Sequence, residues 1–177
     1  RQYSPKGLGD AVLCAKPVIG DSPFAVILPD DLVDSPSSCI GELIAKREEK
    51  GGGNVVAVQN VPREKTNLYG IASVKDAPES VTGLVEKPKP EEAPSTLAVI
   101  GRYVFEPSIF DYLENVTPGA GGEIQLTDAM EASLESVPMT ACRFSGRRFD
   151  CGSKQGFITA TVHYAKKAGF DTSGDAE

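Results

Sequence analysis

The apolar positions of this chain gather in short blocks separated by polar, glycine-rich and proline-rich segments. The clearest block is 24–28, where five apolar residues run together before Pro29, Asp30 and Asp31. An unbroken apolar run of this length is typical of a strand buried on both faces, as in a parallel sheet. Proline has no N–H for a sheet ladder and disfavours helix in the residue before it, so we expect the strand to end there.

The acids after this strand have two interpretations. Open α/β sheets bind ligands beyond the carboxyl ends of their strands, which would make Asp30 a site residue. Asp30, Asp31 and Asp34 equally suit a polar turn that caps the following helix. The choice between the two depends on the rest of the chain.

Downstream, the apolar positions change to a helical period. Ile40, Leu43 and Ile44 share one face of a predicted helix, which the three glycines at 51–53 end. The segment 54–59 then has the composition of a strand. Strand, helix and strand in this order predict a right-handed βαβ crossover.

The second half of the chain continues to alternate strands with helices. Short strands are predicted at 70–74 and 81–85, joined by a turn over 75–80, and a long strand at 96–105 has Gly101 in its middle. A glycine there indicates a β-bulge or the close approach of a ligand. Further predicted elements are helices at 107–113 and 123–134, a strand at 139–144 and a helix after Ser153.

Length and composition place the chain among ordinary globular domains. Its 177 residues suffice for one domain with a core of its own. The net charge of −7 argues against nucleic acid or an anionic membrane surface as the partner. No apolar run approaches the roughly 18 residues of a membrane span. The four cysteines are scattered without a CxxC pair, which indicates free thiols in a reducing, cytoplasmic compartment.

Candidate chemistry is concentrated at predicted strand exits. Asp30 and Asp150 each follow a strand, and two converging carboxylates suit Mg²⁺ with phosphate oxygens completing its octahedron. Such an ion would neutralise triphosphate charge during a phosphoryl or nucleotidyl displacement. Glu86 and Lys87 end another strand and are expected to point to opposite faces, each reaching a different partner. Taken alone, the Glu-Lys-Pro sequence is an ordinary polar strand exit.

Seven short motifs, in order, resemble the bacterial UTP–glucose-1-phosphate uridylyltransferases, also called UDP-glucose pyrophosphorylases. The resemblance covers almost the whole chain, and its specificity comes from the order of the motifs. They are Gln2…Gly7-Leu8-Gly9, Leu28-Pro29-Asp30, Tyr69-Gly70, Val85-Glu86-Lys87-Pro88, Gly101-Arg102-Tyr103-Val104, Gly122-Glu123-Ile124-Gln125-Leu126-Thr127-Asp128 and Asp150-Cys151-Gly152.

The resemblance implies an α/β fold, a Rossmann-like three-layer αβα arrangement with a mixed, mainly parallel central sheet. Residues 1–177 would form a single nucleotidyltransferase domain, incomplete at its N-terminus and with an acidic tail from about residue 169. The implied reaction joins UTP and glucose 1-phosphate to give UDP-glucose and pyrophosphate, with Mg²⁺ as the cofactor. The implied enzyme is cytoplasmic and homo-oligomeric.

The resemblance also implies site residues. Gln2 and Gly7 would contact the uracil of the nucleotide. Asp30 and Asp150 would hold Mg²⁺, and together with Lys87 they would be the catalytic groups.

The implied sugar-phosphate site lies further along the chain. Gly70 and Gly101 would approach the sugar, Glu86 would bind glucose hydroxyls and Lys87 the sugar phosphate. Gln125 and Asp128 are interpreted as structural, because a helix start explains acids and amides in that position.

The chain departs from the family pattern in two respects. The family opens with a Gly-x-Gly-Thr-Arg loop and a following lysine that grip the nucleotide phosphates, and nothing here matches it. We therefore expect a fragment that lacks the first strand of the sheet and does not catalyse the reaction by itself. Asp10 stands where the family usually has histidine, which affects the details of base recognition.

Three alternatives remain at this stage. A sibling enzyme using dTTP or another sugar is the nearest, since base and sugar choice depend on few contacts. A non-catalytic binding or assembly module of the same fold is the second. The third, a cysteine hydrolase using Cys151 and His163, is weak, because His163 has no evident orienting acid in the sequence.

Overall fold

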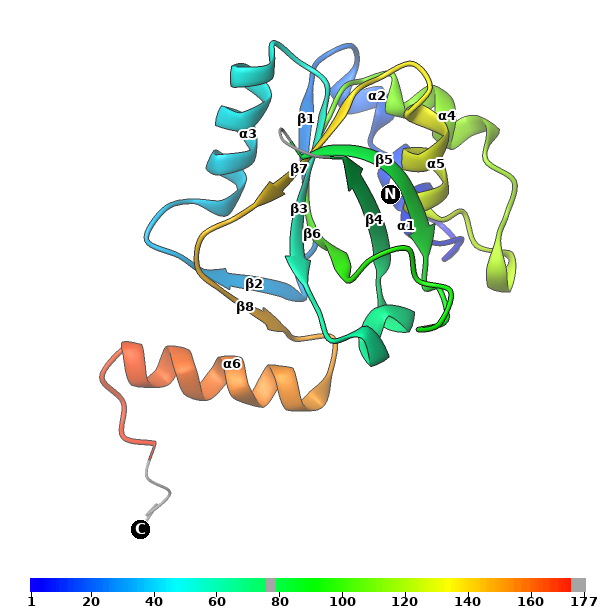
Figure 1. Cartoon of the computed structure of the whole chain (residues 1–177). Helices are drawn as coiled ribbons and strands as arrows, with labels where there is room; N and C mark the ends of the chain where they lie inside the picture. Colours follow the sequence, from blue (N-terminus) through cyan, green and yellow to red (C-terminus); the bar gives the residue numbers. More distant parts are fainter. Residues whose placement is uncertain (76–78, 173–177) are drawn as a thin grey trace.

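A central sheet with helices on both faces organises the computed structural model, which describes residues 1–75 and 79–172 (Figure 1). Within these residues the sheet has six strands in the order β1-β6-β3-β7-β5-β4. Its strands are β1 (Phe24–Ile27), β3 (Asn54–Asn60), β4 (Gly70–Lys75), β5 (Ser80–Glu86), β6 (Leu97–Phe105) and β7 (Met139–Arg143). A separate two-stranded ribbon is formed by β2 (Asp31–Asp34) and β8 (Arg147–Asp150).

The helices are short apart from two. They are α1 (Leu8–Leu13), α2 (Lys16–Ile19), α3 (Cys39–Lys50), α4 (Ile109–Asn115), α5 (Leu126–Ser133) and α6 (Lys154–Lys167), with 3₁₀ turns η1 (Arg63–Leu68) and η2 (Ala120–Gly122). The predicted βαβ order is present as β1, α3 and β3, and the α/β class and three-layer arrangement are confirmed.

The expectation of a mainly parallel sheet is wrong for the described strands. Only β3 and β7 pair in parallel, whereas β6 runs antiparallel to β1, β3 and β4, and β5 runs antiparallel to β4 and β7. The reason is the long strand β6, which enters between β1 and β3 in the opposite direction. The sheet is mixed, as predicted, but most of its hydrogen-bonded pairs are antiparallel.

The apolar run at 24–28 forms an edge strand and not a strand buried on both faces. In the described part of the chain β1 pairs with β6 alone, and Ile27 is 54% exposed. The strand buried along its whole length is β6, all nine residues of which are less than a tenth exposed. The predicted bulge in it is present, because the register against β3 shifts between Val56 and Val58, opposite the segment that contains Gly101.

Two apolar layers hold the helices against the sheet. On one face, α3 buries Leu43 completely against strand residues such as Val55 and Ile100. On the other, α1, α4 and α5 pack against β6, with Phe110 and Met130 buried. Complete burial of a side chain of this size contributes about 1.5–3 kcal/mol. These layers fix the strand ends that carry the candidate chemistry.

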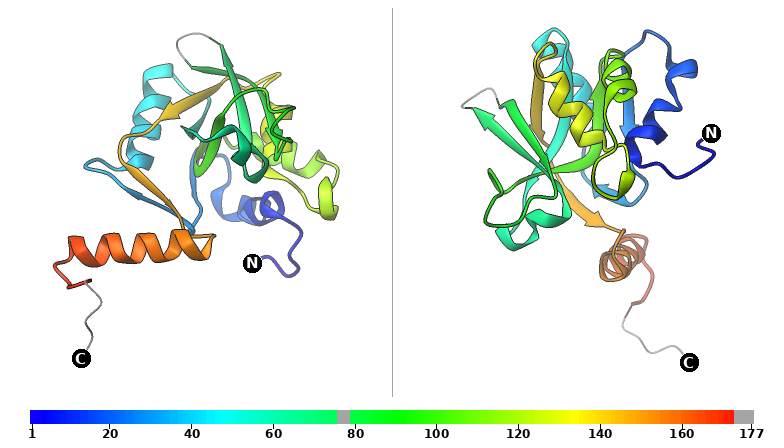
Figure 2. Two further views of the ribbon diagram at one scale, coloured as in Figure 1. Left: turned by 60° about the horizontal axis from the view of Figure 1, so that its bottom comes forward. Right: turned by 90° about the vertical axis from the view of Figure 1, so that its right-hand side faces the viewer.

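The ribbon projects from the sheet, and α6 lies along it, as the two further views show (Figure 2). The oxygen of Ser153 accepts a hydrogen bond from the backbone N–H of Gly156 at 3.0 Å, which is the predicted helix cap. A side chain at Gly156 would overlap the carbonyl oxygen of Asp150, so only glycine lets the helix start so close to the ribbon.

Some expectations concern residues outside the described part. Residues 76–78 of the predicted turn and residues 173–177 of the acidic tail lie there. Cys14, Cys39, Cys142 and Cys151 are all free thiols, as predicted. Among the residues described, none of the helices has the length and apolar character needed to cross a bilayer.

Candidate active site

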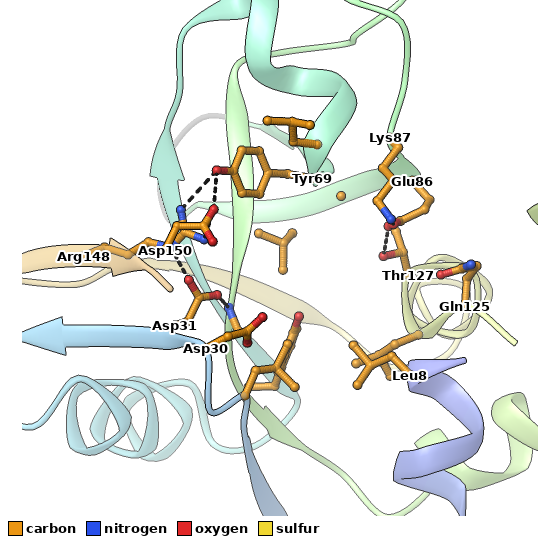
Figure 3. A pocket seen from close by; sticks show the side chains of 17 residues that line it. Leu8, Asp30, Asp31, Tyr69, Glu86, Lys87, Gln125, Thr127, Arg148 and Asp150 are labelled. Carbon is orange, nitrogen blue, oxygen red and sulfur yellow. Dashed lines mark hydrogen bonds and ion pairs between the residues drawn. The ribbon is translucent and has the colours of Figure 1, made fainter. Parts of the chain in front are cut away.

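A pocket of about 290 Å³ opens where the ribbon meets the ends of β4, β5 and the bulged part of β6 (Figure 3). Six residues singled out from the sequence line it together: Asp30, Gly70, Glu86, Lys87, Gly101 and Asp150. The two sides of the pocket differ. We call Asp30, Asp31, Tyr69, Arg148 and Asp150 the ribbon wall, and Glu86, Lys87, Gln125 and Thr127 the β5–α5 wall.

The ribbon brings the two predicted metal-binding acids together. Its antiparallel register places Asp31 opposite Asp150, and the N–H of Cys151 donates to the carbonyl of Asp30 at 2.7 Å. A Cβ added to Gly152 would lie 3.2 Å from Asp30 Oδ2 and 3.2 Å from Asp150 Oδ1. The two carboxylates, 120 positions apart in the sequence, therefore face one small volume.

The two acids have different surroundings. Asp30 is exposed, and within residues 1–75 and 79–172 its carboxylate has no hydrogen-bond or ion-pair partner. Asp150 is held, because its Oδ2 accepts a hydrogen bond from the hydroxyl of Tyr69 at 2.9 Å and lies 3.4 Å from Nη2 of Arg148. Its Oδ1 accepts from the N–H of Gly152 at 3.2 Å.

Asp31 and Arg148 form a buried ion pair behind these acids. Their side chains are 10% and 9% exposed, and Nε of Arg148 donates to Oδ1 of Asp31. The other oxygen of Asp31 accepts from the N–H of Gly101 at 2.8 Å. Burial works against the charge of Arg148, but the hydrogen bonds to Tyr69 and Asp31 outweigh it and raise the pKa of the guanidinium.

Glu86 and Lys87 lie on the same side of the pocket, so the prediction that they point to opposite faces is wrong. The strand ends at Glu86, and Lys87 has a left-handed φ of 44°, which turns its side chain back toward the glutamate. Nζ of Lys87 lies 3.5 Å from Oε1 of Glu86. A left-handed conformation at a residue other than glycine costs roughly 1–3 kcal/mol and is often found at functional sites.

The carboxylate of Glu86 is held in place by a residue of α5. The hydroxyl of Thr127 donates to Oε2 of Glu86 at 2.6 Å. A Cβ at Gly70 would lie 3.0 Å from that hydroxyl and 3.3 Å from Oε2. Glycine at position 70 therefore leaves the carboxylate accessible from the pocket.

The two residues expected to contact the uracil lie outside this pocket. Gln2 donates to the carbonyl of Gly7 at 3.1 Å and to Oδ2 of Asp10 at 2.7 Å. Gly7 has a φ of 102° and packs against the carbonyl of Ile124. Leu8, the next residue, does line the pocket. The nucleotide contacts of Gln2 and Gly7 stay a prediction.

Gly101 lines the pocket, but contacts within the protein already require a glycine there. A Cβ at this position would lie 2.7 Å from Cβ of Leu28 and 2.8 Å from Oδ2 of Asp31. Gln125, which we interpreted as structural, also lines the pocket. Asp128 faces a neighbouring cavity, and burial raises the pKa of its carboxyl.

Sequence reasoning missed several groups of the site. Tyr69, Thr127 and Arg148 reach the pocket, although Tyr69 and Thr127 stood in recognised motifs and Arg148 is two residues before Asp150, on the same strand. The alternation of side chains along a strand places Arg148 on the face of Asp150, which was the available signal.

The surroundings of His163 also differ from expectation. Its Nε2 lies 2.6 Å from Oδ2 of Asp34, so an acid does orient the ring. No hydrogen bond links His163 to Cys151 in the described residues; the thiol of Cys151 lies 3.9 Å from the carbonyl of Phe149. The structure therefore does not bring together the pair that a cysteine hydrolase requires.

The donor set at the two acids fits a hard divalent cation. Two carboxylates face one volume, one of them without a partner in the described residues, and within those same residues no group of three or more His, Cys, Asp or Glu side chains has the geometry of a metal site. Mg²⁺ commonly takes one or two carboxylates and fills its remaining positions with phosphate oxygens and water. The arrangement suits an ion that arrives with a phosphorylated substrate.

Comparisons with known proteins extend over nearly the whole chain. A family described as nucleotidyl transferase matches residues 1–167. A UTP–glucose-1-phosphate uridylyltransferase of Pseudomonas aeruginosa is 47% identical over 165 residues, which are 91% of this chain and 59% of that protein. One of the same name from Komagataeibacter xylinus is 54% identical over 147 residues, 81% of this chain and 51% of its own length.

Solved structures agree with the sequence matches. A UDP-glucose pyrophosphorylase crystallised with UDP-glucose superimposes with a TM-score of 0.90 and 40% identity, covering 94% of this chain and 65% of that one. The resemblance drawn from the seven motifs is thereby confirmed. The chain spans between half and three-fifths of the length of these two curated relatives.

Proposed function

This chain belongs to the nucleotidyl transferase family, and we propose that the protein transfers a uridylyl group from UTP to glucose 1-phosphate. The products are UDP-glucose and pyrophosphate. One observation carries the proposal: Asp30 and Asp150 converge in the pocket that also holds Glu86 and Lys87. The names of relatives 44–54% identical to the chain support the choice of substrates.

In the proposed reaction a phosphate oxygen of glucose 1-phosphate attacks the α-phosphorus of UTP. The new P–O bond forms as the bond from that phosphorus to the bridging oxygen of the β-phosphate breaks, and pyrophosphate leaves with the electron pair. Lys87 supplies a point charge to the sugar phosphate, since its side chain is 58% exposed at the pocket mouth. Glu86 accepts hydrogen bonds from sugar hydroxyls, with Gly70 leaving room for the ring.

Mg²⁺ is the proposed cofactor, and Asp30 and Asp150 would hold it. When bound, the ion neutralises phosphate charge that builds up during the displacement. Two features of this chain support the assignment: the exposed carboxylate of Asp30, which has no partner in residues 1–75 and 79–172, and the anchored carboxylate of Asp150.

Three further parts of the proposal concern base recognition, location and assembly. Gln2 and Gly7 are proposed to contact the uracil through the start of the chain, next to the pocket-lining Leu8. Free thiols at all four cysteines support a reducing, cytoplasmic location. Phe157 and Ile158 on α6 are 60% and 56% exposed, which supports a homo-oligomer.

A turnover assay of the full-length protein tests the proposed function. With Mg²⁺ and glucose 1-phosphate, we expect UTP to be converted to UDP-glucose far faster than dTTP to its counterpart. Asp30→Asn and Asp150→Asn are each expected to lower kcat by at least about a hundredfold, because each removes a carboxylate from the cation. Preference for dTTP would favour the thymidylyl sibling, and no turnover with either nucleotide would favour a binding module.

Residues 1–177 alone are a separate arm of the assay. The chain contains no Gly-x-Gly-Thr-Arg loop for the nucleotide phosphates, so we propose that these residues alone do not complete the reaction. Turnover by residues 1–177 comparable to that of the full-length protein would refute this part.

A further inference from the structure

The carboxylate of Asp150 is held by two side chains, Tyr69 and Arg148, that have no role in the proposed reaction. The hydroxyl of Tyr69 donates to Oδ2 of Asp150, and Nη2 of Arg148 approaches the same oxygen at 3.4 Å. Both contacts fall on one oxygen of the carboxylate, and Oδ1 is the oxygen that faces Asp30 beside Gly152. Figure 3 shows Tyr69 and Arg148 directed toward Asp150.

The holding groups are themselves fixed. Arg148 is tied to the buried Asp31, and its guanidinium lies 5.1 Å from the centre of the Tyr69 ring, a cation–π contact. Asp31 in turn accepts a hydrogen bond from the N–H of Gly101, which lies in β6, so these contacts connect Asp150 to the central sheet. This chain of contacts joins the ribbon, the segment after η1 and the sheet behind a single carboxylate.

We propose that Tyr69 and Arg148 are positioning residues, which hold Asp150 in the orientation that lets it share a divalent cation with Asp30. The inference rests on the proposed function, because it concerns the same site. Rotation about the last bond of an aspartate side chain is soft, so an unsupported carboxylate samples many orientations. Fixing Oδ2 leaves Oδ1 directed at the volume shared with Asp30.

Hydrogen bonds that orient a metal ligand have a measurable effect on metal affinity. Removing such a partner typically lowers metal affinity or activity by roughly 10–100-fold. Among the residues that the structure describes, none supports Asp30 in a comparable way, so the preorganisation of the pair depends on Asp150. We expect loss of the Tyr69 hydroxyl to lower metal affinity by a factor near the lower end of this range, because Arg148 and the N–H of Gly152 still contact Asp150.

Tyr69→Phe in the full-length protein tests the proposal, because it deletes only the hydroxyl. We expect Mn²⁺, used as a spectroscopic probe, to bind about tenfold more weakly in an electron paramagnetic resonance titration without nucleotide. The Mg²⁺ concentration for half-maximal turnover should rise by a similar factor, with KM for UTP unchanged at saturating Mg²⁺. Arg148→Ala would leave Asp31 buried without its partner and lose folded protein, so Tyr69→Phe carries the test.

Two controls separate positioning from a structural role. Tyr112→Phe removes the hydroxyl of a half-buried tyrosine on α4, outside the pocket, and should leave Mn²⁺ affinity unchanged. In a double-mutant cycle, Tyr69→Phe should add nothing to the Mn²⁺ affinity lost in Asp150→Asn, since one acts through the other. A Tyr69 that only supports the fold would lower the melting temperature and leave Mn²⁺ affinity intact.

The outcomes distinguish this inference from the proposed function. Wild-type affinity for Mn²⁺ in Tyr69→Phe, or a loss that adds to that of Asp150→Asn, overturns the inference. So does a wild-type protein that binds no Mn²⁺. A wild-type protein that forms no UDP-glucose refutes the proposed function alone, because the Mn²⁺ titration does not require turnover.

Discussion

The two walls of the pocket are built in opposite ways. On the ribbon wall, Asp31 and Arg148 are about nine-tenths buried, and the guanidinium of Arg148 also contacts Tyr69 and Asp150. On the β5–α5 wall, Lys87 is more than half exposed, and Glu86 has Thr127 as its hydrogen-bond partner among the described residues. The first wall contains a buried ion pair behind its two exposed or half-exposed acids, whereas the second stands at the mouth of the pocket.

This difference separates stability from recognition. A buried charge network stabilises the fold only while every member is paired, so a single deletion there leaves an uncompensated charge. The exposed wall contributes little to folding, and its left-handed Lys87 is a locally unfavourable conformation. We therefore expect substitutions of the buried pair, Asp31 and Arg148, to change stability first, and those on the β5–α5 wall to change substrate affinity first.

Arg148→Ala should have the largest effect. It leaves the carboxylate of Asp31 buried without a cation, which typically costs about 3–5 kcal/mol in the free energy of unfolding. Urea unfolding followed by circular dichroism measures the loss. Arg143→Ala is the matched control, because that arginine pairs with Glu79 at the surface and should lose less than about 1 kcal/mol.

A double variant sharpens this prediction. Asp31→Asn with Arg148→Met removes both charges and keeps an acceptor for the N–H of Gly101. It should be more stable than Arg148→Ala, since no unpaired charge is left in the interior. Equal loss in Arg148→Ala and Arg143→Ala would show that the pair of Arg148 with Asp31 matters no more to stability than a surface pair.

Glu86→Gln should have an intermediate effect, which we expect on substrate affinity and not on stability. Loss of the charge weakens hydrogen bonds from sugar hydroxyls by about 1.5–3 kcal/mol, so KM for glucose 1-phosphate should rise roughly 10–100-fold. The urea midpoint should stay near that of the wild type. Glu92→Gln, an exposed glutamate that also pairs with a lysine, is the matched control and should change neither. A large loss of stability in Glu86→Gln would contradict the division between the walls.

The sequence was most informative where chemistry is local. Predicted strand exits located Asp30, Glu86 and Asp150, and the glycine inside a strand pattern located the bulge at Gly101. It was least informative about pairing partners. Nothing in the run at 24–28 shows that β1 would lie at an edge, because burial depends on which strands pair with it.

The same limit explains the errors at the site. The left-handed turn at Lys87 is a tertiary conformation without a sequence signal, because lysine rarely adopts it. Asp34 reaches His163 on α6 across 129 positions, and Arg148 reaches Asp31 across 117. The second contact follows from the pairing of β2 with β8, and the first also requires α6 to pack against the ribbon. Once that pairing is known, the alternation of side chains predicts the ribbon wall.

The smallest expected effect lies at the far end of the ribbon, where Asp34 meets α6. Hydrogen bonds from Lys167 and then His163 lower the pKa of Asp34 below its ordinary value of 3.8. A carboxyl with a lowered pKa in the folded state contributes stability that is fully present above 3.8 and is lost as the pH falls through the folded value. The side chain of Asp34 is 19% exposed and that of Lys167, its main partner, is 59% exposed, so solvent screens the interaction and we expect a small contribution.

Urea midpoints of the wild type and Asp34→Asn, compared at pH 6, 5, 4 and 3, measure this contribution. We expect the wild type to be slightly more stable at pH 6 and 5, and the difference to shrink toward pH 3 because the wild-type carboxyl becomes protonated. Asp111→Asn, an exposed aspartate on α4, is the matched control and should change the midpoint little at pH 6. A difference that grows as the pH falls would mean that the charge of Asp34 opposes the docking of α6, so the exposed end of the ribbon would behave like neither wall of the pocket.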